Sequence, residues 1–361
     1  MSLPQRSVAY RFPLLLLGFL SLLVGTGAGL LRLGWSFPLP AADLAAVHGP
    51  LMVCCFFGTV ISLERAVALG RAWAYVAPAS AGLAGAALIA GLPAGVAAGL
   101  MALAAGVLLA GSAGIHRRQR EAYTLTLALG AACWLVGVLL WWGGLPVPRL
   151  YGWWLGFLVL TVAGERLELS RFLPPAPTAK RVFALLAGLL VVGMALQSAA
   201  LDSAGRLLGA TALALAGWLL RQDVARRTVR QQGLTRFIAV CLLSGYAWLA
   251  FGGAVLLVSP AIPFAYDAAL HAIFVGFVLA MVFGHAPVIF PAVVRVPIPY
   301  HPFFYLPLAL LHLSLLVRLG GDLLSAPPWR AAGGAGNALA LAAFVAVTLA
   351  AVRRGQRSRA V

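Results

Sequence analysis

The chain has 361 residues, of which 62% are hydrophobic and only 10% are charged, and its mean hydropathy is +0.98. A soluble domain of this length needs far more charged surface, so the composition excludes a soluble globular protein. The net charge of +17 does not indicate a nucleic-acid partner, because the basic residues lie in short loops between apolar runs and form no folded basic face.

Apolar runs of about 20 residues recur along the chain, and a helix of this length spans a bilayer. The first run is followed by further runs and lacks an obvious cleavage site, so we interpret it as a retained helix rather than a signal peptide. We expect an all-α polytopic membrane protein with a single domain, residues 1–361. Its twelve predicted spans are 12–34, 43–65, 73–91, 94–115, 121–143, 149–169, 180–200, 203–221, 236–258, 264–290, 302–319 and 329–352.

The basic residues are distributed unevenly over the loops between these spans. If the N-terminus is inside and the loops alternate, 21 of the 26 Lys and Arg residues lie on the inner side. This is the positive-inside bias of membrane proteins. It predicts a bacterial-type plasma (inner) membrane, both termini in the cytoplasm, and anionic lipid headgroups as partners.

Twelve spans divide into three groups of four, at 12–115, 121–221 and 236–352. The second, sixth and tenth spans then occupy equivalent places, and their sequences resemble one another faintly. A three-by-four pseudo-repeat is one explanation. Chance similarity among helices rich in Leu and Ala is the other.

The second span carries the first unusual residue, His48, in the stretch "HGPLMVCCFFG". An imidazole in so apolar a segment is costly unless a partner satisfies it. Gly49 would leave room for a flat porphyrin beside the histidine. The four cysteines, by contrast, lie within spans and lack the spacing of a zinc motif, so we expect small packing residues; they are Cys54, Cys55, Cys133 and Cys241.

Three carboxylates stand near the inner ends of the second and sixth spans: Glu64, Glu165 and Glu168. Arginines follow two of them directly. Ion pairing at the membrane edge is one interpretation, and a proton-entry path is the other, which needs a route for water.

The tenth span carries His271 and His285, fourteen residues apart. In a regular α-helix this spacing brings the two to within about 40° on one face and separates them by roughly 21 Å along the axis. b-type cytochromes use this spacing to hold two stacked haems. Asp267 lies one turn before His271, where it orients the imidazole as an acceptor or is an exposed loop acid.

The predicted topology places His48 and His271 at similar depth on the outer side. Two histidines on separate helices supply the axial ligands of a haem iron, and hydrogen bonding within the bundle is the alternative. On the cytoplasmic half, His285, His301 and His312 are candidates for a second haem or a copper site; capping, hydrogen bonding and proton relay are the alternatives.

These residues carry a resemblance. "HGPLMVCCFFG" is similar to the low-spin haem segment of haem-copper oxidase catalytic subunits, in which a His-Gly of the second span pairs with a histidine of the tenth. The layout more closely resembles NnrS-type proteins, twelve-span haem- and copper-containing relatives linked to nitric oxide metabolism. Unlike the oxidases, this chain has no histidine in its sixth or seventh span. That absence argues against oxygen reduction of the oxidase type.

The resemblance implies a haem b protein for electron transfer or a nitric-oxide-related stress response, with a redox donor protein or quinol as partner. As an enzyme it would be a haem-dependent membrane oxidoreductase acting on nitric oxide or a related small molecule. Two alternatives stay open. One is a proton-coupled secondary transporter or channel, with Pro287 and Pro291 as helix breaks. The other is a scaffold subunit without a cofactor of its own.

Overall fold

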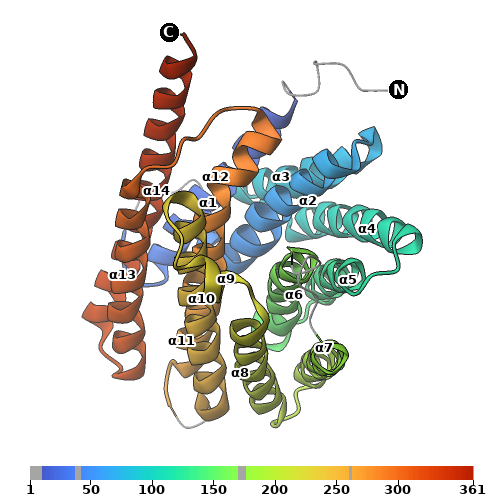
Figure 1. Ribbon diagram of the computed structural model, residues 1–361. Coiled ribbons are helices and arrows are strands. Elements are labelled where there is room, and N and C mark those ends of the chain that lie inside the picture. Colours follow the sequence, from blue (N-terminus) through green and yellow to red (C-terminus); the bar gives the residue numbers. More distant parts are fainter. Residues whose placement is uncertain (1–9, 37–41, 170–175, 260–261, 361) are drawn as a thin grey trace. The chain divides into compact units, whose positions relative to one another are not determined.

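The computed structural model describes residues 10–36, 42–169, 176–259 and 262–360, and these residues form helices joined by short turns, with no strand among them (Figure 1). A helix lies over each of the twelve predicted spans. The long helices and their π-helical parts are α1 (Arg11–Leu31), η3 (Pro50–Phe57) with α2 (Gly58–Leu69), α3 (Val76–Ile89), α4 (Ala94–Arg118), α5 (Ala122–Trp142), α6 (Tyr151–Leu169), α7 (Pro177–Ser198), α8 (Ala204–Gln222), α10 (Gly233–Val258), α11 (Ala265–His271) with η8 (Ala272–Leu279) and α12 (Ala280–Val294), α13 (Tyr305–Leu323) and α14 (Pro327–Ala360). The short helices are η2 (Ala42–Val47), η4 (Ala72–Tyr75), η5 (Val147–Arg149), α9 (Ala225–Thr228) and η9 (Pro302–Phe304).

Ten of the described helices are long and apolar enough to cross a membrane. The other two predicted spans are the helices α6 and α8. The C-terminal turns of α6 carry Glu165, Arg166 and Glu168, and α8 has Arg206 near its start and Arg221 near its end. Such charges lower the mean hydropathy of a short helix, which is why these two fall below the other ten.

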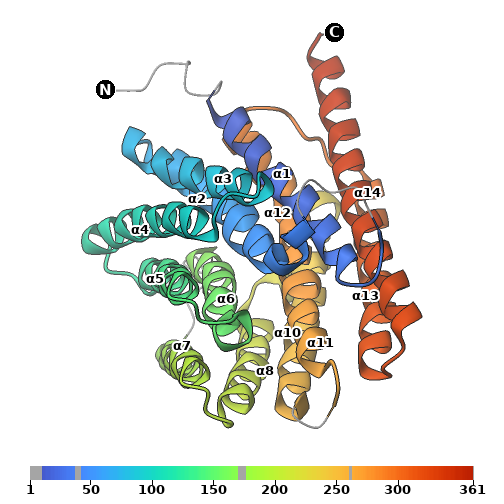
Figure 2. The ribbon, with the colours of Figure 1, turned by 180° about the vertical axis from the view of Figure 1, so that it is seen from behind.

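The chain divides into two compact units, Met1–Glu168 (unit 1) and Leu169–Val361 (unit 2). The boundary falls inside the second predicted group of four spans, so the four-helix repeats stay a prediction. In unit 1, α1 packs against η3, α2 and α3, and α4 packs between α3 and α5 (Figure 2). Glycines let α5 and α6 approach closely, since a Cβ at position 130 would lie 3.2 Å from the carbonyl oxygen of Phe157.

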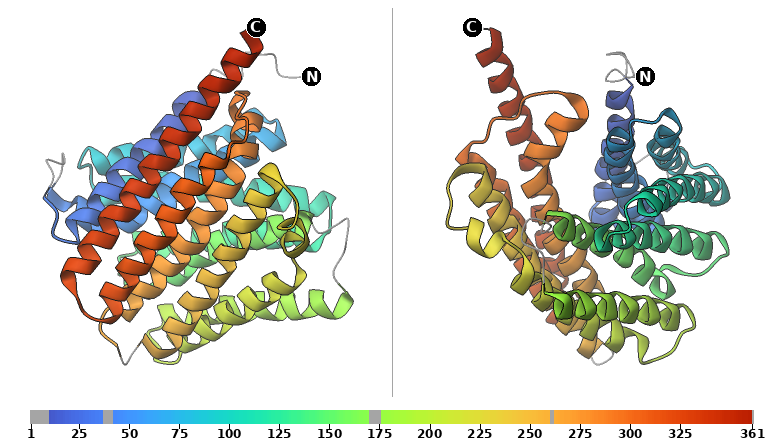
Figure 3. Two further views of the ribbon diagram at one scale, coloured as in Figure 1. Left: turned by 60° about the vertical axis from the view of Figure 1, so that its left-hand side comes forward. Right: turned by 45° about the vertical axis from the view of Figure 1, so that its right-hand side comes forward.

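Unit 2 is built around α10, which packs against α8 on one side and against α11, η8 and α12 on the other. The most extensive helix pair of this unit is α13 with α14. These two helices follow one another in the sequence and pack side by side (Figure 3). α13 also packs against α11 and η8. The start of α11 and the α13–α14 turn lie at the same end of unit 2 (Figure 1).

Two spans depart from the regular α-helix that the sequence predicts. A π-helix of 8 residues begins at Pro50 and another at Ala272. Proline has no N–H to donate, which suits the first position of a helical segment. In the second π-helix, Gly276 lies where a Cβ would collide with the ring of Trp248. Because π turns hydrogen-bond over five residues, the α-helical angle and rise between His271 and His285 do not apply.

The packing role predicted for the cysteines is confirmed. Cys54, Cys55, Cys133 and Cys241 are free thiols and fully buried within the helices. Each behaves as a small apolar side chain in a close-packed interior.

Candidate functional site

His48 lies between the short helix η2 and the π-helix η3, and α1 holds its ring in place. Its Nδ1 lies 2.7 Å from the carbonyl oxygen of Gly25. A carbonyl only accepts, so Nδ1 carries the proton and Nε2 carries the lone pair. Gly29 lies one turn further along α1, where a Cβ would be 2.8 Å from Cε1 of the imidazole. The "GTGAG" stretch of α1 therefore supplies both the acceptor and the space for this ring.

His271 is the last residue of α11, directly before the π-helix η8. Its Nδ1 lies 2.8 Å from the carbonyl oxygen of Asp267, on the preceding turn of the same helix. The Asp267 carboxylate is further away, with 3.5 Å between its Oδ1 and Nδ1 of His271. The backbone of Asp267 thus orients the imidazole, and the side chain serves a different purpose.

That side chain belongs to an ionic cluster of two aspartates and two arginines from three helices. Oδ2 of Asp267 accepts a hydrogen bond of 2.7 Å from Arg318 and one of 3.2 Å from Arg330. Arg330 also donates to Oδ1 of Asp322, and Nε of Arg318 lies 3.7 Å from Oδ2 of Asp322. Asp322 is fully buried, and the Arg318 side chain is only 6% exposed. Opposite charges in equal number make such a cluster tolerable in an apolar bundle.

The packing of α13 against α14 brings the two arginines together. Gly333 of α14 lies against the backbone of Arg318, and Gly321 of α13 lies against the backbone of Arg330, with no space for a Cβ at either glycine. The guanidinium of Arg330 also lies 4.0 Å above the ring of Phe264. Phe264 itself adopts a φ of 56°, a backbone angle that residues other than glycine rarely take. Several contacts therefore fix the start of α11, just before Asp267.

The three remaining membrane histidines of unit 2 have separate surroundings. His285 repeats the contact of His271, with its Nδ1 2.7 Å from the carbonyl oxygen of Met281. Nδ1 of His301 accepts from the backbone N–H of Phe303 and caps the short helix η9. Nδ1 of His312 accepts a bond of 2.9 Å from the indole of Trp248. Its Nε2 lies 3.0 Å from the hydroxyl of Ser244, so both of its nitrogens are engaged.

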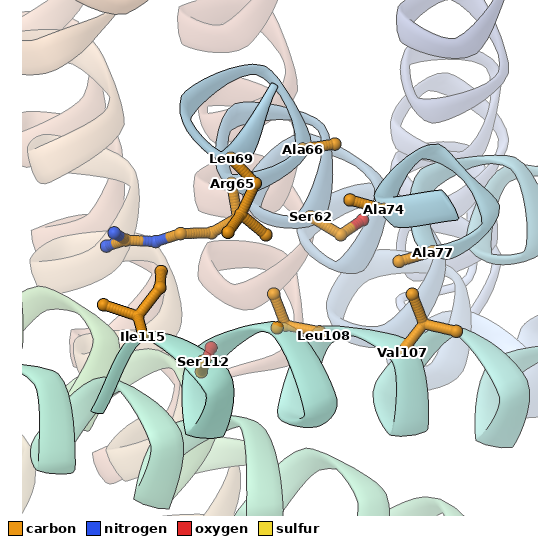
Figure 4. Close-up of a pocket in the computed structure, with 11 residues that line it drawn as sticks. Ser62, Arg65, Ala66, Leu69, Ala74, Ala77, Val107, Leu108, Ser112 and Ile115 are labelled. Atoms are coloured by element: carbon orange, nitrogen blue, oxygen red, sulfur yellow. The ribbon is translucent and has the colours of Figure 1, made fainter. Parts of the chain in front are cut away.

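The three carboxylates predicted for the inner side lie near the C-terminal ends of α2 and α6 in unit 1. The guanidinium of Arg65 lies 3.9 Å from Glu165, and the carboxylates of Glu64 and Glu168 lie near enough to interact electrostatically with Glu165. Arg65 also borders a small pocket between α2, α3 and α4, with its side chain extending over Ile115 (Figure 4). The walls of this pocket are mostly small or apolar side chains. One ion pair is thus present at this edge, between Arg65 and Glu165, and a proton-entry path stays a prediction.

Of the two roles left open for Asp267, neither describes it fully: its backbone oxygen accepts from His271, and its carboxylate pairs with arginines. His285, His301 and His312 have separate hydrogen-bond partners. In the described parts of the chain, no three His, Cys, Asp or Glu side chains are grouped so that they could hold a metal ion. Sequence reasoning did not identify Arg318, Arg330 and Asp322 as members of one cluster with Asp267. The signal was available, because both arginines belong to the five basic residues on the predicted outer side, against the positive-inside bias.

The long apolar helices and the polar groups buried between them define a multi-pass helical membrane protein. A family model described as "Domain of unknown function (DUF8744)" matches residues 11–353, and the chain belongs to this family. A comparison with curated proteins gives no match.

Proposed function

We propose that this chain is a membrane-embedded haem protein in which His48 and His271 are the axial ligands of a low-spin haem b. The observation that carries the proposal is the common local structure of these two residues. Nδ1 of each faces a backbone carbonyl, at 2.7 Å for His48 and 2.8 Å for His271. Each ring is then oriented by its Nδ1–H, and Nε2 is the atom that would bind the iron. This is the usual arrangement of metal-binding histidines.

The π-helices add a second argument. π turns are rare in proteins overall, and those that do occur are often found at functional sites. One begins two residues after His48 and the other directly after His271. His285 shares the carbonyl contact but is followed by α-helix. It stays a candidate for a second haem or a copper site.

Gly49, directly after His48, adds no side chain beside the ring. A Cβ at this position would lie 3.6 Å from Cζ3 of Trp154, an ordinary van der Waals contact, so the Trp154 ring would border a bound macrocycle. The four buried cysteines do not form the Cys-x-x-Cys-His pattern that attaches haem covalently, so a non-covalent haem b suits the chain. A haem bound by two imidazoles in an apolar bundle supplies one-electron transfer.

The biological setting of the proposal follows from the resemblance to NnrS-type proteins and from the charge distribution. We infer a bacterial-type inner membrane with both termini in the cytoplasm, and a role in electron transfer or a nitric-oxide-related stress response. A redox donor protein or quinol would supply the electrons. If the protein turns over substrate, it acts as a haem-dependent oxidoreductase on nitric oxide or a related small molecule.

The test is the visible spectrum of the purified protein, oxidised and dithionite-reduced, with a pyridine haemochrome assay for stoichiometry. We expect a Soret band and sharp reduced α and β bands, and we expect His48→Ala and His271→Ala each to lose the low-spin spectrum. His116→Ala is the matched control. This histidine also has a bonded Nδ1, at 2.8 Å from Thr124, but it lies in the basic last turn of α4.

Two results would contradict the proposal. One is full haem retention in either axial-ligand variant. The other is a featureless spectrum from folded protein made with haem available, together with solute movement in proteoliposomes, which would favour the transporter alternative.

A further inference from the structure

We infer that Arg318 and Arg330 are positioning residues for His271: they hold the Asp267 carboxylate away from the imidazole, so that Nδ1–H donates to a neutral carbonyl. The inference rests on the proposed function, because it concerns the properties of His271 as an iron ligand. It assigns a role to a charged cluster that the haem proposal itself does not use.

The geometry of Asp267 places two acceptors beside one donor. Nδ1 of His271 lies 2.8 Å from the backbone oxygen of Asp267 and 3.5 Å from its Oδ1. The shorter distance is an ordinary hydrogen bond, whereas the longer one exceeds the normal range. A carboxylate is the stronger acceptor, so another interaction must keep it out of reach.

The two guanidinium groups provide that interaction. Both bind the same oxygen, Oδ2, with Arg318 at 2.7 Å and Arg330 at 3.2 Å. Arg318 is held in turn by Asp322 and by the close packing of Gly333 on its backbone. The carboxylate is therefore fixed through the oxygen that does not face the imidazole.

The consequence for an iron ligand is a defined basicity. An imidazole that donates to a carboxylate gains imidazolate character and becomes a more basic ligand, which favours ferric iron. An imidazole that donates to a neutral carbonyl gains less imidazolate character and is a less basic ligand. Loss of Arg318 would let Oδ1 approach Nδ1 and would shift the haem to a lower midpoint potential.

The experiment is a potentiometric titration of the α band in four proteins: wild type, Arg318→Gln, Asp267→Asn and the double variant. Asp267→Asn keeps the backbone carbonyl and replaces the carboxylate with a neutral amide. We expect Arg318→Gln to lower the potential in the wild-type background and to change it much less in the Asp267→Asn background. Arg330→Gln should give a smaller downward shift than Arg318→Gln, because its contact with Oδ2 is longer. Arg206→Gln, at an exposed arginine of the same unit, is the control for loss of a surface charge.

A simple through-space charge effect predicts a different result. The loss of one positive charge would then lower the potential equally in both backgrounds, and additive shifts of this kind would overturn the inference. Rescue by Arg318→Lys, which retains the charge, should be incomplete, because an ammonium group lacks the planar fork of arginine.

A measurement without haem separates this inference from the proposed function. In haem-free protein labelled with ¹⁵N-histidine, the Nδ1–H resonance of His271 is assigned by its loss in His271→Gln. Arg318→Gln should move this proton downfield, towards a stronger hydrogen bond, and should not do so when Asp267→Asn is also present. An unchanged resonance in Arg318→Gln would overturn the inference, whereas a wild-type protein that never binds haem would overturn only the proposed function.

Discussion

His48 in unit 1 and His271 in unit 2 share the same local hydrogen bonding but have different surroundings. Each directs Nδ1 to a carbonyl oxygen and each leads into a π-helix of 8 residues. The acceptor of His48, however, is Gly25, which belongs to a neighbouring helix. The acceptor of His271 is Asp267, four residues earlier in its own helix.

This difference decides what each ring depends on. His48 is oriented by the approach of two helices, and a glycine-rich face of α1 makes that approach possible. His271 is oriented by its own helix, and its surroundings are set by four charged side chains from three helices. Steric changes should therefore act most strongly on the first histidine and electrostatic changes on the second.

The largest effect on stability is expected from Asp322→Leu in unit 2. This substitution removes a fully buried carboxylate and leaves Arg318 and Arg330 with one acidic partner, Asp267. Breaking a buried ion pair from one side costs about 3–5 kcal/mol. Unfolding in detergent, followed by circular dichroism, measures the loss. Arg206→Leu, at an exposed arginine, should change the unfolding free energy little, and equal losses in the two variants would contradict the role given to the cluster.

A smaller effect is expected from Gly29→Ala in unit 1. The added Cβ would lie 2.8 Å from Cε1 of His48, so the ring or the helix must move. Overpacking of this kind costs about 1–3 kcal/mol, and we also expect a weaker low-spin haem signal. The matched control is Gly106→Ala, because a Cβ at that position meets nothing within 4 Å. A Gly29→Ala protein with unaltered stability and spectrum would show that α1 does not hold His48.

The smallest effect is expected from His312→Leu, which tests a histidine outside both sites. The variant loses the bonds to Trp248 and Ser244, at a cost of about 1 kcal/mol. Haem content should stay at the wild-type level, because both imidazole nitrogens already have protein partners. Loss of a haem or copper signal in this variant would assign His312 to a cofactor site after all.

Local pattern was sufficient for the helices, because hydrophobic runs of membrane-spanning length are visible in the chain itself. Each predicted run coincides with a helix, and the cysteines are buried as predicted. The π-helices were beyond that reasoning, since the composition of "PLMVCCFF" and "AIFVGFVL" suits an α-helix equally well. The two forms differ in whether the backbone hydrogen bonds span four residues or five, and the residue pattern of these segments does not show which is formed.

The sequence by itself determined the class of the protein and the approximate ends of its spans, because both depend on the composition of continuous stretches of chain. It placed Asp267 one turn before His271 without deciding which of its oxygens faces the ring. Only the tertiary structure decided that Gly25 is the partner of His48, 23 residues away. It also decided that Arg318 and Arg330 reach Asp267 from 51 and 63 residues away. These contacts depend on how helices pack, and packing is set by many small side chains together rather than by any single motif.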